Sequence, residues 1–215
     1  MDSCLVGSEM CIRDRNSGKL TNHDGEPFQK FELQNGNIRK VIVDKDDNVW
    51  MGTRKGIYRY NQKKNEVVSF NAKIRDLSQG VIADFIVFAL YEDSNNNIWV
   101  GTDGYGLFSY SAVEDAFTWH GKDSEIRNMS INSITQTYDG YFWLGTDNGL
   151  IRYDQTNEGF RVFESADGLL SKKINRSAFY TERNTLYLGT SEGINFFDFN
   201  NVPLNTTLPK IIFQD

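Results

Sequence analysis

Cysteine, histidine and proline are scarce in this chain of 215 residues, which contains two, two and three of them respectively. Both cysteines, Cys4 and Cys11, lie in the first fifteen residues, so the rest of the chain cannot form disulfides. A transition-metal site needs several nitrogen or sulfur ligands at defined spacings, which His23 and His120 alone do not provide. We therefore expect no metal and no cofactor, and we expect both histidines to lie in loops.

Long apolar runs and an excess of positive charge are missing as well. The best candidate for a membrane span, residues 81–90, is ten residues long and contains Asp84, whereas a transmembrane helix needs about 20 apolar residues. The formal net charge is −6, which argues against nucleic acid as a partner. No serine occupies a recognisable nucleophile elbow. The composition thus predicts a segment that neither inserts into a membrane nor carries catalytic residues.

The chain instead repeats one short sequence motif. It consists of an aromatic residue, an aliphatic residue, Gly-Thr, a polar turn that ends in glycine, and further apolar residues. The glycine of the Gly-Thr pair recurs at intervals of 49, 44 and 44 residues. A nearly constant period of this size indicates a repeat architecture rather than a single wound domain. The copies are WMGTRKGIYRY from Trp50, WVGTDGYGLFSY from Trp99, WLGTDNGLIRY from Trp143 and YLGTSEGINFF from Tyr187.

One repeat has the makeup of four antiparallel strands. In the third copy, a β-branched run at residues 133–137 precedes an Asp-Gly turn signal and a strand at 141–146. Asn148-Gly149 is the pair most favoured in a tight hairpin turn, after which residues 150–153 run back as a third strand. A polar stretch then leads to a fourth strand at 160–163. Four strands in about 44 residues are typical of one blade of a β-propeller.

Both faces of the second strand are apolar. Trp143 and Gly145 share one face because side chains alternate along a strand, and Leu144 points to the other. Neighbouring blades bury both faces of a blade, and glycine beside the aromatic residue suggests a slot for a side chain of the next blade. We therefore predict an all-β fold, an arc of about four repeats with four-stranded antiparallel blades, an incomplete ring and almost no helix. Four aromatic residues should occupy equivalent positions: Trp50, Trp99, Trp143 and Tyr187.

These motifs resemble the two-component regulator propeller repeat, which occurs in the sensor region of hybrid two-component systems from polysaccharide-degrading bacteria. The stretch YEDSNNNIWVGTDGYGLFSY from Tyr91 is similar to the consensus of that repeat. LYLGTSEGINFFDFN from Leu186 resembles the closing blade of such a propeller, and the sequence from Asn200 resembles the linker into a following immunoglobulin-like domain. The resemblance implies blades at residues 16–200, in the C-terminal part of a larger propeller, and a linker at 201–215.

Residues 1–15 do not fit this pattern. LVGSEMCIRD from Leu5 is similar to the translation of a transposon adaptor used in sequencing libraries, so we interpret residues 1–15 as a non-native assembly artefact. The alternative, a signal peptide, lacks an apolar central region because Gly7, Ser8, Glu9 and Arg13 interrupt it. We expect this segment to contribute no blade strand.

One end of the propeller is the best candidate for a ligand site, because the turns between second and third strands meet the connections between blades there. An exposed aromatic ring beside hydrogen-bonding groups suits a sugar, and the extra residue in the second copy's turn should push Tyr105 outward. The alternative is that Tyr105 merely packs on a neighbouring loop. The candidate ligand-binding residues are Tyr105, Asp103, Arg54 and Asn148.

A second motif imitates the start of a calcium loop. The segment from Asp93 to Asn97 has the D-x-N-x-N spacing, but Ile98 stands where such loops need glycine and Gly104 where they need glutamate. The same place in the first copy, residues 44–48, reads DKDDN, with aspartate instead of asparagine at the third position. Turns stabilised by Asn and Asp side chains explain both segments, because these residues tolerate left-handed backbone and bond to nearby amides.

The resemblance implies a periplasmic, non-catalytic sensor that takes part in detecting oligosaccharides and signals to downstream kinase domains. Its implied partners are the other blades of the propeller, a following β-sandwich domain and a second copy of the full-length sensor. Two alternatives remain open. One is a general protein-interaction scaffold, which the sequence does not separate from a sensor. The other is a propeller lyase, which the scarcity of histidine disfavours.

Overall fold

The computed structural model describes residues 37–202 except 121, 123 and 124, together with Leu33 and two short strands, β1 (Ile12–Arg13) and β2 (Leu20–Thr21). These two strands pair with each other in a unit, Met1–Gly36, that is separate from the rest. Neither joins a blade. Most of the segment interpreted as an artefact and most of the predicted linker lie outside the described residues, so both interpretations stay predictions.

Residues 37–202 form four antiparallel sheets, here called blades 1 to 4, each built from strands that are consecutive in sequence. Blade 1 contains β3 (Ile38–Val43), β4 (Asn48–Thr53), β5 (Gly56–Asn61) and β6 (Glu66–Ser69). Blade 2 contains β7 (Val87–Glu92), β8 (Ile98–Thr102), β9 (Leu107–Ser111) and β10 (Ala116–His120). Blade 3 contains β11 (Ile131–Gln136), β12 (Phe142–Thr146), β13 (Gly149–Asp154) and β14 (Gly159–Phe163). Blade 4 contains β15 (Ile174–Glu182), β16 (Thr185–Thr190) and β17 (Ile194–Asp198).

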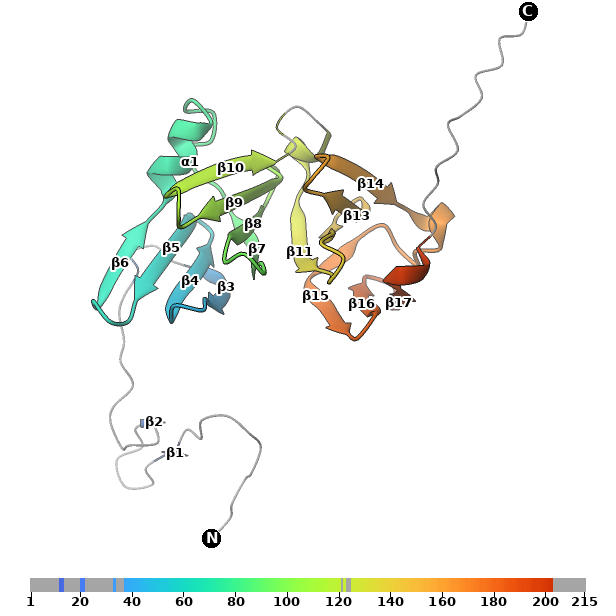
Figure 1. Cartoon of the computed structure of the whole chain (residues 1–215), viewed down its shortest axis with the longest axis horizontal. Coiled ribbons are helices and arrows are strands. Elements are labelled where there is room, and N and C mark those ends of the chain that lie inside the picture. The colour runs from blue at the N-terminus through green and yellow to red at the C-terminus, as the bar shows by residue number, and fades with distance from the viewer. Residues whose placement is uncertain are drawn as a thin grey trace, which may run out of the picture. The chain divides into compact units, whose positions relative to one another are not determined.

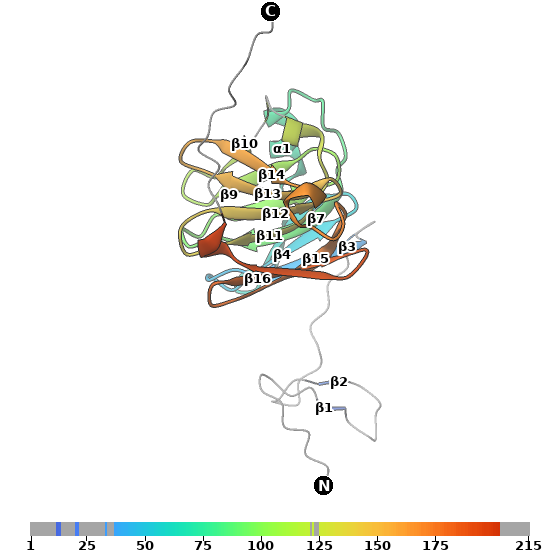
Figure 2. The ribbon, with the colours of Figure 1, turned by 90° about the vertical axis from the view of Figure 1, so that its right-hand side faces the viewer.

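The blades lie side by side in an arc (Figure 1). The first strands of successive blades contact one another on the inside of the arc, and the fourth strands lie at its outer rim. Figure 2 views the arc from the blade 4 end, where the strands of blade 4 face the viewer. The predicted propeller arc is confirmed, with one difference. Blades 1 to 3 have four strands, whereas blade 4 has three among the described residues.

Helix is rare, as predicted, and one short α-helix, α1 (Asn71–Leu77), is described. Three single 3-10 turns accompany it, η1 (Glu125–Asn128), η2 (Ser165–Asp167) and η3 (Phe199–Asn201). This helix lies in the connection between blades 1 and 2. Phe70, Ile74 and Leu77 are spaced for one helical face, and all three pack into the core between blades 1 and 2. No helix among the described residues is long and apolar enough to cross a membrane.

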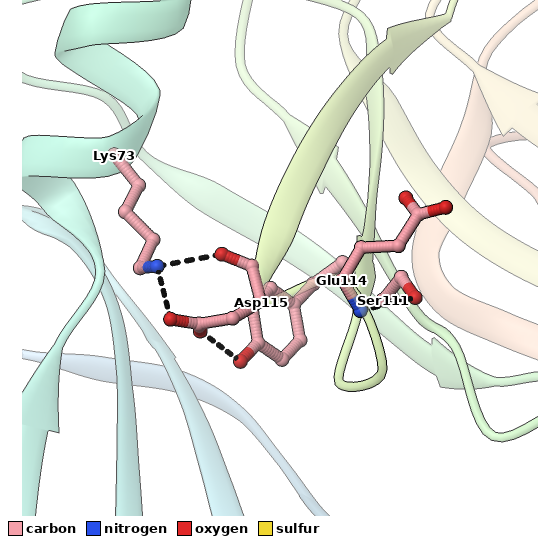
Figure 3. Close-up of polar contacts among 5 residues, drawn as sticks. Lys73, Ser111, Glu114 and Asp115 are labelled. Carbon is pink, nitrogen blue, oxygen red and sulfur yellow. Dashed lines mark hydrogen bonds and ion pairs between the residues drawn. The ribbon is translucent and has the colours of Figure 1, made fainter.

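Polar contacts also attach α1 to blade 2 (Figure 3). The ammonium of Lys73 donates to the backbone carbonyl of Asp115 at 2.6 Å and lies 2.7 Å from its carboxylate. The hydroxyl of Tyr110 donates to the same carboxylate at 2.6 Å. These hydrogen bonds from Lys73 and Tyr110 lower the pKa of Asp115. Because the ion pair is exposed to solvent, it positions the helix more than it stabilises the fold.

The repeated aromatic residues occupy equivalent positions in the second strand of each blade, as predicted. Trp50, Trp99 and Trp143 are at most 1% exposed, because each faces the next blade along the arc. Tyr187 is only half-buried. Its face of blade 4 carries Tyr180 and Phe196, which are 63% and 67% exposed, and no described blade covers them.

The repeated glycines provide the predicted slots. A Cβ atom at Gly52 would lie 2.5 Å from the side chain of Val87, and one at Gly145 would lie 2.6 Å from that of Ile174. A Cβ atom at Gly101 would lie 2.8 Å from both the side chain and the carbonyl oxygen of Ile131. In each case the intruding residue is the first residue of the next blade's first strand. The glycine of one blade therefore receives the first residue of the next.

We expect Gly101→Ala to lower the free energy of unfolding by about 1–3 kcal/mol, because the new methyl group would overlap a backbone atom that cannot move without disturbing β11. Gly159→Ala is the matched control, since a Cβ atom there meets nothing within 4 Å. Urea unfolding of both variants checks this expectation. Equal effects of the two substitutions would contradict the slot interpretation.

Candidate functional site

The turns between second and third strands and the connections between blades meet at one end of the arc, here called the mouth. The amide of Gly106 donates to the carbonyl of Met129 at 3.0 Å, and that of Gly149 donates to the carbonyl of Lys172 at 2.7 Å. In blade 1, the amide of Ile57 donates to the side chain of Asn71 at 3.0 Å. In blades 1 to 3 the turn region is thus bonded to the connection that follows the blade, and in blade 4 the amide of Ser191 donates to Lys173 in the connection that precedes it.

The threonine of each Gly-Thr pair shapes these turns. The hydroxyl of Thr102 donates to the carbonyl of Gly106 at 2.8 Å, and that of Thr146 donates to the carbonyl of Gly149 at 2.7 Å. Thr146 also accepts from the amide of Asn148 at 3.0 Å. Thr53 and Thr190 make the same pair of bonds in blades 1 and 4. The sequence repeats threonine here because its side chain closes the turn. The sequence analysis did not predict this role, although the threonine recurs in all four repeats.

Tyr105 does not point freely outward, as the longer turn had suggested. It is half-buried and packs against the core between blades 1 and 2. Its carbonyl accepts a hydrogen bond from the indole of Trp119 at 3.0 Å. Gly104 and Gly106, both at positive φ, give the turn its shape. Tyr105 therefore packs on its neighbours in part, as the alternative interpretation expected. Substituting this residue will affect the core as well as the surface.

The other candidates differ in how accessible they are. Asp103 is half-buried, and its carboxylate accepts from the hydroxyl of Ser130 at 2.7 Å. Arg54 and Asn148 are exposed at the turns of blades 1 and 3. All four candidates therefore lie at the mouth, on three consecutive blades. Arg54 and Asn148 present the most accessible polar groups.

Asn132 is a further polar residue, which sequence reasoning did not single out. Its amide nitrogen donates to Asp147 and to the carbonyl of Ile174, at 2.9 Å in each case. Its side-chain oxygen is buried without a partner among the described residues. It lines a cavity of about 50 Å³ to which all four blades contribute, including Lys40 and Ser177. That volume suits one water molecule or one hydroxyl group.

The prediction that His120 lies in a loop is wrong. His120 is the last residue of β10 and is 7% exposed. Its ring stacks on Trp99 and bonds to the hydroxyls of Ser109 at 2.7 Å and Tyr153 at 2.9 Å. Burial lowers the pKa of His120 to about 4. The residue therefore joins blades 2 and 3 as a neutral side chain. His23 lies outside the described residues.

The D-x-N-x-N segments form turns organised by their first aspartate. One carboxylate oxygen of Asp93 accepts from the amides of Asn95 and Asn97, both at 2.8 Å. The other accepts from the side chain of Asn97 at 3.0 Å and from the indole of Trp99 at 2.8 Å. Asp44 binds the indole of Trp50 in the same way at 2.8 Å. Protein donors engage both oxygens, as the Asx-turn interpretation predicts. No group of three or more His, Cys, Asp or Glu residues among those described could hold a metal ion.

Blade 3 lacks this aspartate. Thr137 stands six residues before Trp143, where Asp44 and Asp93 stand relative to their tryptophans. The indole nitrogen of Trp143 is buried and has no partner among the described residues. An unpaired buried donor carries a desolvation cost of about 1–3 kcal/mol.

We expect Thr137→Asp to give a gain in the free energy of unfolding of about 1 kcal/mol that depends on the indole of Trp143, because the new carboxylate can accept from it. The substitution also removes the bonds that the Thr137 hydroxyl donates to Asp139 and to the carbonyl of Tyr141, and this loss is the same with or without the indole. Urea unfolding measures the gain. The same substitution in a Trp143→Phe background is the control, since that variant has no indole to bond. A gain of equal size in both backgrounds would contradict this explanation.

Comparison with known proteins identifies the repeats. Residues 32–55, 80–104 and 125–148 match the family described as two component regulator propeller. Each match runs through the first two strands of a blade to the turn at the mouth, and together they include Arg54, Asp103 and Asn148. The chain carries two-component regulator propeller repeats. Their match explains why the mouth turns resemble one another from blade to blade.

Proteins similar to this chain include a histidine kinase and extracellular domains of two component systems. The chain is 26% identical over 194 residues to histidine kinase P4 of Formosa agariphila. The aligned region makes up 88% of this chain and 14% of the kinase. The chain is 25% identical, with a TM-score of 0.64, to the extracellular domain of a hybrid two component system from B. thetaiotaomicron, covering 84% of this chain and 23% of that one. A second such domain from B. thetaiotaomicron shares the fold at 21% identity, with a TM-score of 0.61, and covers 91% and 30% of the two chains. The chain therefore spans only a small part of the proteins it resembles.

Proposed function

We propose that these regulator propeller repeats belong to a periplasmic sensor that takes part in detecting oligosaccharides and passes the signal to kinase domains elsewhere in the protein. The similarity to extracellular domains of hybrid two-component systems carries this proposal. The segment itself performs no catalysis and needs no cofactor. Its partners are the remaining blades of the propeller, a following β-sandwich domain and a second copy of the full-length sensor.

The mouth is the proposed ligand surface. Arg54 and Asn148 present donors and acceptors to solvent from the turns of blades 1 and 3, and a sugar hydroxyl can bond to either. Tyr105 offers the exposed part of an aromatic ring, and Asp103 offers the carboxylate oxygen that Ser130 does not engage. Together they support recognition of a polar, ring-shaped ligand such as an oligosaccharide. The mouth turns of other blades would complete the site.

We expect Arg54→Ala and Asn148→Ala each to weaken oligosaccharide binding by the complete extracellular region about tenfold, which corresponds to about 1.4 kcal/mol. Because both side chains are exposed, the melting temperature should not change. Titration calorimetry against a panel of oligosaccharides measures the affinities. Lys63→Ala, an exposed residue in the turn between β5 and β6, is the matched control.

Tyr105 needs a different substitution because it also packs on the core. Tyr105→Phe keeps the ring and removes only the hydroxyl, so it tests hydrogen bonding without loss of packing. If an oligosaccharide binds the wild type and all three mouth variants equally, the mouth residues of this arc do not form the site. Product analysis of the same samples tests the absence of catalysis, and cleavage of any oligosaccharide would contradict it.

A further inference from the structure

The first strand of blade 4 contains a large bulge. Ile174 and Phe179 are five positions apart, but their partners on β16 are only two positions apart. In blade 3, Ile131 and Ile134 are three positions apart, and their partners on β12 are again two positions apart. β15 therefore carries two more residues than β11 at the same place. Bulges are frequent beside functional sites, where they redirect side chains.

This bulge reaches across the inside of the arc, where β15 contacts β7. The guanidinium carbon of Arg176 lies 3.6 Å from the centroid of the Phe88 ring on β7, two blades away. The next residue, Ser177, has a φ of 54°, in the left-handed region that non-glycine residues rarely adopt. Backbone strain of this kind is concentrated at ligand sites. The bulge is thus both long and strained.

The bulge forms one wall of the small cavity that Asn132 lines. Ser177 contributes to this wall from β15, and Lys40 lines the cavity from β3. Lys40 is half-buried and Ser177 is exposed, so the cavity opens on the inside of the arc. Asn132 connects the cavity to the mouth, because its amide nitrogen bonds to Asp147, the neighbour of the candidate residue Asn148.

The polar groups around the cavity determine what can fill it. Because both partners of the Asn132 amide nitrogen are acceptors, the orientation of this side chain is fixed, and its buried oxygen needs a donor. Ser133 already donates to a carbonyl of β15 and accepts from an amide of β15. The side chains of Lys40 and Ser177 have no hydrogen-bond partner among the described residues. A carboxylate cannot donate to Asn132 and an ammonium cannot accept from Lys40, whereas a hydroxyl group does both.

We propose that the cavity binds one hydroxyl group of the oligosaccharide, an inference that rests on the proposed function of the mouth. The hydroxyl donates to the side-chain oxygen of Asn132 and accepts from Lys40 and Ser177. The volume of about 50 Å³ fits a hydroxyl group but not a further sugar unit. The sensor therefore recognises a sugar whose hydroxyl at one defined position is free, and it rejects polymers that carry a branch there.

Monodeoxy analogues of the tightest-binding oligosaccharide of the panel test this site. Titration calorimetry on the complete extracellular region compares each analogue with its parent. One analogue should bind at least about thirtyfold more weakly, because it leaves the oxygen of Asn132 unpaired. In Lys40→Met that analogue should lose at least about fivefold less affinity than in the wild type, since the two changes remove one shared hydrogen bond.

Two variants test the protein side. Lys40→Met should weaken binding of the parent oligosaccharide at least about tenfold, whereas Lys63→Met, an exposed lysine in the turn between β5 and β6, should bind it like the wild type. Ser177→Gly removes the hydroxyl and the left-handed strain together. It should bind the parent about fivefold more weakly, while its melting temperature stays equal or rises.

The outcomes separate this inference from the proposed function. If both Lys40→Met and Ser177→Gly bind the parent like the wild type, the cavity holds only water and the inference fails, although the mouth still binds the oligosaccharide. The inference also fails if every analogue loses as much affinity in Lys40→Met as in the wild type. If no oligosaccharide of the panel binds at all, the proposed function fails with it.

Discussion

Asp93→Ala is expected to lower the free energy of unfolding by about 3–5 kcal/mol, because it would leave four donors without their acceptor at a site that is 2% exposed. These donors are the amides of Asn95 and Asn97, the side chain of Asn97 and the indole of Trp99. Urea unfolding measures the loss. The indole proton resonance of Trp99 should also shift, because its hydrogen bond is lost.

Asp46→Ala is the control for this substitution. Asp46 occupies an equivalent turn of blade 1, but it is exposed, and its effect should stay within about 0.5 kcal/mol. If Asp93→Ala were as mild as Asp46→Ala, the bond between carboxylate and indole would not be the reason for the repeated D-x-N-x-N pattern.

His120 makes the fold sensitive to mild acid. Its pKa is about 4 in the folded chain, whereas an exposed histidine in the unfolded chain has a pKa of about 6.5. Between these values the unfolded state binds a proton that the folded state does not. Stability should therefore fall by about 3 kcal/mol as the pH drops from 6.5 to 4, with no further loss from this residue below pH 4.

His120→Gln separates this effect from the titration of carboxylates. The variant is less stable at neutral pH because it loses the stacking on Trp99, but its free energy of unfolding should change less between pH 6.5 and 4.5. Urea unfolding at several pH values measures both curves. Parallel curves for wild type and variant would show that His120 is not the source of the acid sensitivity.

The sequence predicted the repeated parts of the fold well, because each is determined within one repeat. Trp143, Gly145 and the turn at Asn148 recur with fixed spacing, and local strand and turn preferences suffice to place them. What the sequence did not show depends on contacts between blades. His120 reads as a loop residue until Trp99 and Tyr153 are seen to enclose it.

For the candidate site, too, the sequence predicted the local features and missed those that depend on contacts between blades. Its turns could be placed from the Gly-Thr pairs, so Arg54, Asp103, Tyr105 and Asn148 were correctly expected at the end of a second strand. How far each side chain reaches into solvent could not be predicted. Tyr105 packs on a core shared by two blades, and Asp103 binds Ser130, which precedes the first strand of the next blade. Ser130 lies 27 residues from Asp103 in sequence, beyond the reach of local patterns.

The glycine slots act as a standard joint between blades. Gly52, Gly101 and Gly145 contact Val87, Ile131 and Ile174 respectively. All three interfaces therefore pair a glycine of one blade with a β-branched residue at the start of the next blade. A gene duplication that inserts one more repeat would meet compatible surfaces on both sides without inventing a new interface. The number of blades can therefore change during evolution while the chemistry of the joint stays constant. Divergence can then concentrate in the turns at the mouth, where residues such as Arg54 and Asn148 are exposed and take no part in the joint.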